Sequence, residues 1–161
     1  MSITFTPIGS IETPFNDLKG MPIQPSGAAE VKGTVILNRE YEAGLSDLEG
    51  FSHIILLYHF HQSQGYDLMV TPFMDDQKRG LFSTRAPRRP NPIGLSIVQL
   101  IKIEKNRIDI QCIDVLNGTP LIDMKPYVPG FDAKETTRLG WLDKNYKKSE
   151  SLKSDERFIE K

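Results

Sequence analysis

The rest of the chain is arranged around one segment, which reads Leu81-Phe82-Ser83-Thr84-Arg85-Ala86-Pro87-Arg88-Arg89-Pro90-Asn91-Pro92-Ile93-Gly94-Leu95-Ser96. Apolar runs typical of strands lie on both sides of it. Each proline fixes its own φ and pushes the preceding residue toward an extended conformation, so the segment is expected to be stiff. In a polyproline II conformation Arg85 and Arg88 would project from the same side. Two guanidiniums on an ordered backbone favour an anionic ligand, and a loop with solvated arginines is the alternative.

Length and composition indicate a globular protein with one domain. The chain has 161 residues, of which 39% are hydrophobic and 25% charged, which is ordinary for a chain that buries its own core. The net charge of −1 hides an uneven distribution. Five basic residues without an acid among them fall within twelve positions, namely Lys78, Arg79, Arg85, Arg88 and Arg89. One basic segment on a near-neutral protein favours a local contact with nucleic acid or phosphate.

The cysteine content and the apolar runs indicate the compartment. Cys112 is the single cysteine, which excludes an internal disulfide and fits a reducing cytoplasm. The longest apolar run is shorter than the ~18 residues that a membrane-spanning helix needs. The first residues lack the basic and apolar regions of a signal peptide. We therefore expect a cytoplasmic location and no membrane contact.

Apolar runs separated by turn signals predict the strands. They are Ile3–Ile8, Val31–Leu37, Phe51–Phe60, Leu95–Lys105, Arg107–Ile113 and Leu121–Tyr127, with Gly80–Ser83 as a further short candidate. Phe51–Phe60 is apolar at nearly every position and is therefore expected to be a central strand covered on both faces. The fold class predicted is mostly β: a single-domain β-barrel, closed or nearly closed, with short helices and an irregular C-terminal tail.

The segments between the strands are expected to be loops and one short helix. Residues 9–33 are rich in proline, glycine and small polar residues and predict a long functional or mobile loop. Ser46 resembles an N-cap, with Glu49 at the capping-box position. We expect residues 1–135 to form the barrel domain. Residues 136–161 would be an extension that is partly packed through Trp141 and flexible after about residue 146.

The histidines do not have the spacing of a metal site. His53, His59 and His61 share one strand parity, but a metal site needs three or four convergent ligands, so no metal is expected. His53 and His59 are interpreted as core histidines, and His61 as a ligand contact where the strand ends. Cys112 lies on a predicted buried strand and lacks the environment of an activated nucleophile. The sequence also lacks the glycine-rich motif of a Rossmann fold, a Walker A motif and a nucleophile elbow.

A second dense segment runs from Asp114 to Tyr127. Asp114 lies at a strand end, where a carboxylate can hold a ribose or a cationic group. Asp123, Lys125 and Tyr127 alternate onto one face of a strand and offer an acid, a base and a hydrogen-bond donor together. A surface ion pair with Tyr127 in packing is the alternative, and both interpretations stay open.

Three groups of motifs appear in order along the chain. They are Phe51-Ser52-His53-Ile54 with His61-Gln62, then residues 83–96, then Asn117-Gly118-Thr119-Pro120-Leu121-Ile122-Asp123-Met124-Lys125-Pro126-Tyr127. Together they closely resemble the TrmO (TsaA-like) family of S-adenosylmethionine-dependent tRNA methyltransferases, over roughly residues 3–132. Asn117 departs from the family, which usually has aspartate before Gly-Thr-Pro.

The resemblance implies a β-barrel enzyme that works as a homodimer. It would methylate N6 of threonylcarbamoyladenosine (t6A) in the anticodon loop of tRNA, giving m6t6A. By motif position the cofactor S-adenosyl-L-methionine would contact Gln24, Pro25, Ser26, His61, Gln62, Arg85, Leu95, Gln111, Cys112, Ile113 and Asp114. The catalytic residues would be Asp123, Lys125, Tyr127 and His61, with Asp123 or His61 as the proton acceptor.

The resemblance also divides the basic segment. Arg85 would point inward to the cofactor, while Lys78, Arg79, Arg88 and Arg89 would hold the tRNA backbone or the threonyl carboxylate. Two alternatives remain. One is an RNA-binding β-barrel without catalysis, and the other is a methyltransferase that acts on a different small substrate.

Overall fold

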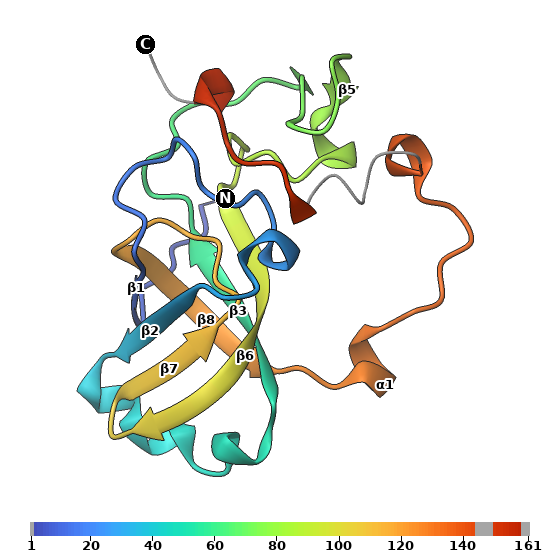
Figure 1. Ribbon diagram of the computed structural model, residues 1–161. Helices are drawn as coiled ribbons and strands as arrows, with labels where there is room; N and C mark the ends of the chain where they lie inside the picture. The colour runs from blue at the N-terminus through green and yellow to red at the C-terminus, as the bar shows by residue number, and fades with distance from the viewer. Residues whose placement is uncertain (1, 144–149, 159–161) are drawn as a thin grey trace.

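Six antiparallel strands close into a barrel in the computed structural model, which describes residues 2–143 and 150–158 (Figure 1). Around the barrel the strands follow the order β1-β2-β7-β6-β3-β8. Their bounds are β1 Gly9–Glu12, β2 Lys32–Leu37, β3 His53–His59, β6 Ile93–Glu104, β7 Arg107–Gln111 and β8 Thr119–Pro126. Two further short strands, β4 (Met69–Val70) and β5 (Arg79–Gly80), pair with each other outside the barrel. The predicted fold class, a mostly β barrel, is confirmed.

The helices of the described residues are short. They are η1 Pro25–Ala28, η2 Arg39–Leu45, η3 Leu48–Gly50, η4 Leu81–Ser83, α1 Pro129–Asp132, η5 Gly140–Leu142 and η7 Glu156–Phe158. The expected helix start at Ser46 is wrong. Asp47 takes a left-handed conformation, with φ of 66°, and η3 begins at the next residue without a side-chain cap. None of the helices within the described ranges is long and apolar enough to cross a membrane.

The first strand lies further along the chain than predicted. The alternation in Ile3–Ile8 is not used, because Ile3 and Phe5 are 74% and 57% exposed. β1 lies instead inside the segment expected to be a loop, where Ile11 is fully buried and the strand pairs with β2 and β8. Gly80–Ser83 is not one strand either, since β5 ends at Gly80 and η4 follows it. The other predicted strands are confirmed, with shifted ends.

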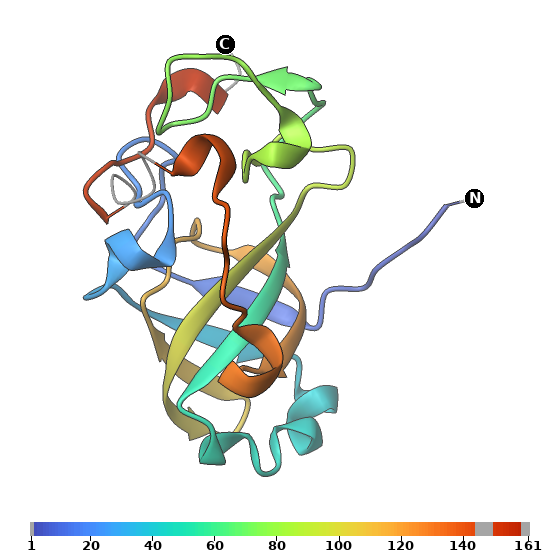
Figure 2. The same cartoon turned by 90° about the vertical axis from the view of Figure 1, so that its right-hand side faces the viewer.

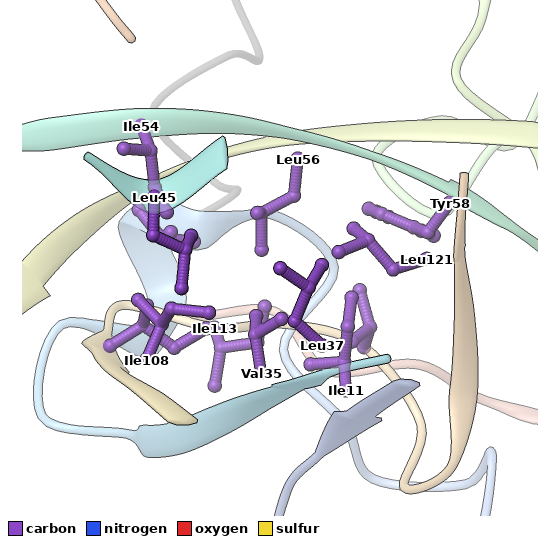
Figure 3. Close-up of a cluster of buried hydrophobic side chains, with 13 residues drawn as sticks. Ile11, Val35, Leu37, Leu45, Ile54, Leu56, Tyr58, Ile108, Ile113 and Leu121 are labelled. Atoms are coloured by element: carbon purple, nitrogen blue, oxygen red, sulfur yellow. The ribbon is translucent and has the colours of Figure 1, made fainter. Parts of the chain in front are cut away.

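Alternate residues of each strand point into the barrel and form its core (Figure 3). In β3 the inward residues Ile54, Leu56 and Tyr58 are buried, whereas the outward residues Ile55 and Leu57 are only half-buried. Each fully buried aliphatic side chain stabilises the fold by about 1.5–3 kcal/mol. The prediction that this strand is covered on both faces is therefore wrong within the single chain.

The two outward histidines of β3 are not core residues. His59 is exposed because it lies on the outer parity at the end of the strand. His53 is half-buried, and its Nδ1 lies 2.9 Å from the hydroxyl oxygen of Ser52. Its ring also meets that of Tyr127 edge to face, with the ring centres 6.4 Å apart. The interpretation of both as core histidines is corrected, because strand parity separates them from the inward residues.

The two ends of the barrel differ. η2 and η3 lie at one end, and the β4–β5 pair lies beyond the other end together with η4, η5 and η7 (Figures 1 and 2). The segments at this second end come from distant parts of the chain, so they can bring residues of several motifs together.

Candidate functional site

A cavity of about 1030 Å³ lies where the second end of the barrel meets these loops. Its walls come from the segment before and within η1, the end of β3, the segment around η4, the start of β6 and the segment after β7. From the C-terminal part of the chain Trp141, Leu142, Ser154, Asp155 and Phe158 also line it. This volume is at the upper end of the range typical of small-molecule sites. It is the meeting point of the motifs singled out in the sequence.

Eight of the eleven predicted cofactor contacts line this cavity. They are Gln24, Pro25, Ser26, His61, Gln62, Arg85, Leu95 and Asp114. Gln111, Cys112 and Ile113 do not line it. Ile113 is fully buried in the core, while the Gln111 amide and the Cys112 thiol both reach the Ala29 carbonyl oxygen, at 2.8 and 3.4 Å. These two side chains therefore hold the end of η1, which carries part of the cavity wall.

Arg85 is exposed to the cavity and bridges two of its walls. Its Nη1 donates to Oε1 of Gln24, 61 residues away in the sequence, at 3.0 Å. The backbone before Arg85 is fixed by Thr84, whose Oγ1 donates to the Leu81 carbonyl at 2.8 Å and accepts from the Ala86 amide at 3.3 Å. A guanidinium held in this way offers several N–H groups in a planar fork to an anionic ligand.

Asp114 ends a chain of hydrogen bonds that begins inside the barrel. Ser96 Oγ donates to Asp114 Oδ1 at 2.6 Å, and Tyr58 Oη lies 2.9 Å from Ser96 Oγ. Burial raises the pKa of Asp114 to about 6, against the lowering effects of the Ser96 bond and the Arg85 charge. Burial also raises the pKa of Tyr58, so its hydroxyl stays protonated. The Ser96 bond and the Arg85 charge therefore offset only part of the cost of removing the Asp114 carboxylate from water.

His61 is the one predicted catalytic residue that lines the cavity. Burial lowers its pKa, with the His59 charge acting in the same direction and the His59 carbonyl opposing it. The imidazole is therefore neutral at pH 7 and can accept a proton.

Asp123, Lys125 and Tyr127 lie apart from the cavity. In β8, Lys125 is paired with Ile55 and Asp123 with Leu57, both outward residues of β3, so the trio follows the outer face of the barrel. Lys125 Nζ lies 2.6 Å from Asp123 Oδ2. Within one chain the structure brings Arg85, Asp114 and His61 together but does not bring this trio to them.

The basic residues beside the cavity have different partners. Arg88 donates from Nε to the Gln64 carbonyl at 3.1 Å and does not line the cavity. Arg89 does line it, and its Nη1 donates to the carbonyls of Thr84 and Ala86 at 3.1 and 3.2 Å. Arg85 lines the cavity and bonds Gln24, whereas Arg88 bonds Gln64 outside it, so the expectation that both project from one side is wrong. Arg79 pairs with Asp75 at 2.7 Å, and Lys78 is exposed.

The C-terminal segment supplies cavity walls that sequence reasoning missed. Trp141 Nε1 donates to the Ser83 carbonyl at 2.8 Å, and Phe158 packs on the small cluster of Val70, Leu81 and Ala86. Trp141, the single tryptophan of the sequence, was the only signal in this charged tail. Ser154 also exchanges backbone bonds with Gly20 and Met21. The predicted flexibility after residue 146 concerns in part residues 147–149 and 159–161, which lie outside the described ranges.

Tyr58 and Ser96 were also missed, because a buried tyrosine and a serine in a strand give no sequence signal of their own. As for metals, residues 2–143 and 150–158 contain no group of three His, Cys, Asp or Glu side chains arranged to hold an ion.

Known proteins similar to this chain include an S-adenosyl-L-methionine-binding protein and a tRNA methyltransferase. The family model described as tRNA-methyltransferase O N-terminal domain matches residues 10–133. A probable S-adenosyl-L-methionine-binding protein of Pyrococcus abyssi is 50% identical over 159 residues, which are 99% of this chain and 86% of that protein. The rat tRNA (adenine(37)-N6)-methyltransferase is 36% identical over 136 residues, 80% of this chain and 32% of that enzyme.

Solved structures of TrmO proteins are also similar to this chain. The crystal structure of TrmO from Pseudomonas aeruginosa has a TM-score of 0.74 and 38% identity, covering 89% of this chain and 64% of that one. The chain thus spans less than two thirds of that solved protein and about a third of the rat enzyme. The family match over residues 10–133 is more than half of the chain, and so the chain belongs to the tRNA-methyltransferase O N-terminal domain family.

Proposed function

We propose that this protein is an S-adenosylmethionine-dependent tRNA methyltransferase that acts on N6 of t6A and gives m6t6A. The observation that carries the proposal is the cavity in which Arg85, Gln24 and Asp114 meet at the end of the barrel. The names of the relatives, which include S-adenosyl-L-methionine-binding proteins and tRNA (adenine(37)-N6)-methyltransferases, support the same reading.

The donor set of the cavity fits S-adenosylmethionine. The guanidinium of Arg85 suits the methionyl carboxylate, and the carboxylate of Asp114 suits the ribose hydroxyls. Leu95, 48% exposed, offers an apolar surface and backbone groups for the adenine. When bound, the cofactor supplies an activated methyl group on its sulfonium sulfur for an in-line displacement.

The residues of this chain align the reactants and hold protons. The cavity walls would fix the approach of the acceptor base to the cofactor, which is the main requirement of an in-line transfer. The target nitrogen must lose a proton, and His61, whose pKa is lowered by burial, is the proposed acceptor within the chain. The assignment of Asp123, Lys125 and Tyr127 to catalysis stays a prediction, because they lie on the outer face of β8.

The surface beside the cavity suits an anticodon loop. Phe82 lines the cavity and is 75% exposed, with the Arg89 guanidinium 5.8 Å from its ring centre. Exposed aromatic rings and arginines are the usual partners of unpaired RNA bases. We propose that Lys78, Arg79, Arg88 and Arg89 hold the phosphates or the threonyl carboxylate. Replacing Arg88 and Arg89 together with alanine should weaken tRNA binding and flatten its salt dependence, which filter binding at several salt concentrations measures.

Three broader expectations belong to the same proposal. A homodimer is supported by apolar residues on the outer face of β3 and β6, including Ile93 and Leu95. Division into a barrel domain, residues 1–135, and an extension, residues 136–161, is supported by the end of the last barrel strand at Pro126. A cytoplasmic location follows from tRNA as the substrate.

Two experiments test the function. Calorimetric titration with S-adenosylmethionine should give measurable heat with the wild type and none with Arg85→Ala, while Arg39→Ala, in η2 at the other end of the barrel, should bind normally. Binding of RNA without this heat would favour the RNA-binding barrel without catalysis. Mass spectrometry of tRNA nucleosides from a strain lacking the protein should show loss of m6t6A. An unchanged profile in a strain whose purified protein binds the cofactor would favour another substrate.

A further inference from the structure

Two consecutive hydrogen bonds connect the Asp114 carboxylate to Ser96 and then to Tyr58. Ser96 is 1% exposed and Tyr58 is 4% exposed, and both lie on the inner face of the barrel, where Tyr58 also lines the cavity. We propose that Ser96 and Tyr58 are positioning residues that hold the Asp114 carboxylate in the orientation in which it accepts the cofactor's ribose hydroxyls. This inference rests on the proposed function and assigns two residues to its cofactor site.

The two hydrogen bonds both run toward Asp114, from Tyr58 to Ser96 and from Ser96 to the carboxylate. An ionised carboxylate only accepts hydrogen bonds, so Ser96 must donate to Asp114 Oδ1, over 2.6 Å. The hydroxyl oxygen of Ser96 is then available to accept from Tyr58, over 2.9 Å. Tyr58 therefore locks the rotation of the Ser96 hydroxyl, and Ser96 locks one oxygen of Asp114. The carboxylate also accepts from the Asp114 backbone amide, and its remaining acceptor positions can accept from a ligand in the cavity.

These hydrogen bonds give a reason for the glycine and the serine of the Gly94-Leu95-Ser96 motif. Tyr58 is paired with Gly94 across β3 and β6, and a Cβ atom at position 94 would lie 2.2 Å from Cε2 of the tyrosine ring. Glycine therefore lets the ring lie across β6, so that its hydroxyl reaches Ser96 two residues further along. In residues 2–143 and 150–158, every buried side-chain nitrogen or oxygen of a residue that is not exposed has a partner. The glycine and the serine of the Gly-Leu-Ser motif thus serve one arrangement.

The charged and titratable groups around Asp114 define what a test will measure. Arg85 faces it from the loop after η4, and Tyr58 from β3, while His61 lines the same cavity after the end of β3. The Ser96 bond and the Arg85 charge both lower the pKa of Asp114, against burial. Removing the Ser96 hydroxyl therefore raises this pKa, which loss of packing elsewhere in the barrel would not do.

The experiment compares Ser96→Ala with a matched control. Thr34→Val removes another hydroxyl that bonds a carboxylate, that of Asp109 at 3.0 Å, on β2 and β7 outside the cavity. Two quantities are measured from pH 5 to pH 8. One is the affinity for S-adenosylmethionine by calorimetry, and the other is the titration of the Asp114 carboxyl carbon by NMR in the free protein.

In the wild type, affinity should fall as the pH drops through about 6, where the Asp114 carboxylate is protonated. Ser96→Ala should move the midpoints of both profiles to higher pH and weaken binding at pH 7 about tenfold, the loss expected for one bond to a charged group. Tyr58→Phe should move both midpoints in the same direction by less, and it serves as the second variant if Ser96→Ala does not fold. Thr34→Val should leave both profiles in place.

The outcomes separate the two proposals. Binding of the cofactor with unshifted midpoints in Ser96→Ala and Tyr58→Phe would overturn this inference and leave the proposed function standing. Absence of binding by the wild type at every pH would overturn the proposed function, and the role of Asp114 in holding a ribose with it. Midpoints that also shift in Thr34→Val would assign the effect to general loosening of the barrel and so overturn the inference.

Discussion

Asp114 shows how a site residue can lower the stability of the fold that carries it. Its pKa is raised from 3.8 to about 6, mainly by burial. Between pH 4 and pH 6 the Asp114 carboxyl is therefore protonated to a greater extent in the folded chain than in the unfolded chain, and its contribution to the free energy of unfolding falls as the pH rises through this window. At neutral pH the charged, buried carboxylate therefore lowers the free energy of unfolding. Such a loss of stability is typical of residues that are kept for function.

Asp114→Asn should therefore stabilise the protein above pH 6. Asparagine keeps an oxygen that accepts from Ser96 but carries no charge. The raised pKa corresponds to at most about 3 kcal/mol, and the partial exposure of the residue reduces the expected gain to about 1 kcal/mol. Urea unfolding at pH 7.5 and at pH 3.5 measures it. A gain of the same size at both values would contradict the electrostatic cause, because at pH 3.5 the carboxyl is already neutral.

At the scale of elements, the pairing of β3 with β6 depends on one glycine. Tyr58 lies across Gly94, and any side chain at that position meets the ring rather than a flexible tip. Gly94→Ala should destabilise the barrel by about 2 kcal/mol or more, because the clash moves either the ring or the strand. Thermal and urea unfolding measure this loss.

Gly44→Ala is the matched control. Gly44 lies in η2 with no atom within 4 Å of its added Cβ, so that substitution should change stability by a few tenths of a kcal/mol. Tyr58→Leu should make Gly94→Ala less costly, since it removes the ring that the new methyl group meets. Equal costs of Gly94→Ala in both backgrounds would show that the glycine is needed for another reason.

The sequence predicted those elements whose apolar pattern is complete on one face. β3 and β7 were found with shifted ends, because their inward residues alternate without interruption. β6 was found as well, although its register shifts between Leu100 and Lys102. β1 was missed because its four residues hold a single buried aliphatic side chain, and its place is set by pairing with β2 and β8. Pairing with distant strands leaves no local signal, so such a strand resembles a loop.

The site was predicted where motifs supply the residues and missed where packing does. Arg85 and Asp114 stand in dense polar segments and were found, and the structure brings both to one cavity. Tyr58 and Ser96 lie on apolar strands, where their hydroxyls become partners only through the register of β3 and β6. Trp141 reaches the cavity from a charged tail, and only the three-dimensional fold places it beside Ser83.

At the scale of the whole molecule, the outer face of β3 and β6 carries several apolar side chains that are not fully buried within one chain. β3 and β6 lie side by side on the face turned to the viewer in Figure 2, and their outward residues include Ile55, Leu57, Ile93 and Leu95. The segment from residue 133 to 139 is exposed throughout and arches away from the barrel in Figure 1, with Leu139 40% exposed. These surfaces suit a second copy of the chain, which is the proposed homodimer.

Introducing a charge on this face should therefore separate the dimer. Ile55 is half-buried and outward on β3, does not line the cavity, and would lie in the contact between two chains. Ile55→Asp should shift the mass measured by light scattering from two chains to one, because an unpaired carboxylate in an apolar interface is costly. Ile36→Asp is the control, since Ile36 is equally half-buried and outward but lies on β2, across the barrel from β3. Dissociation by both variants would point to general unfolding, and a wild type that is monomeric at micromolar concentration would refute the dimer outright.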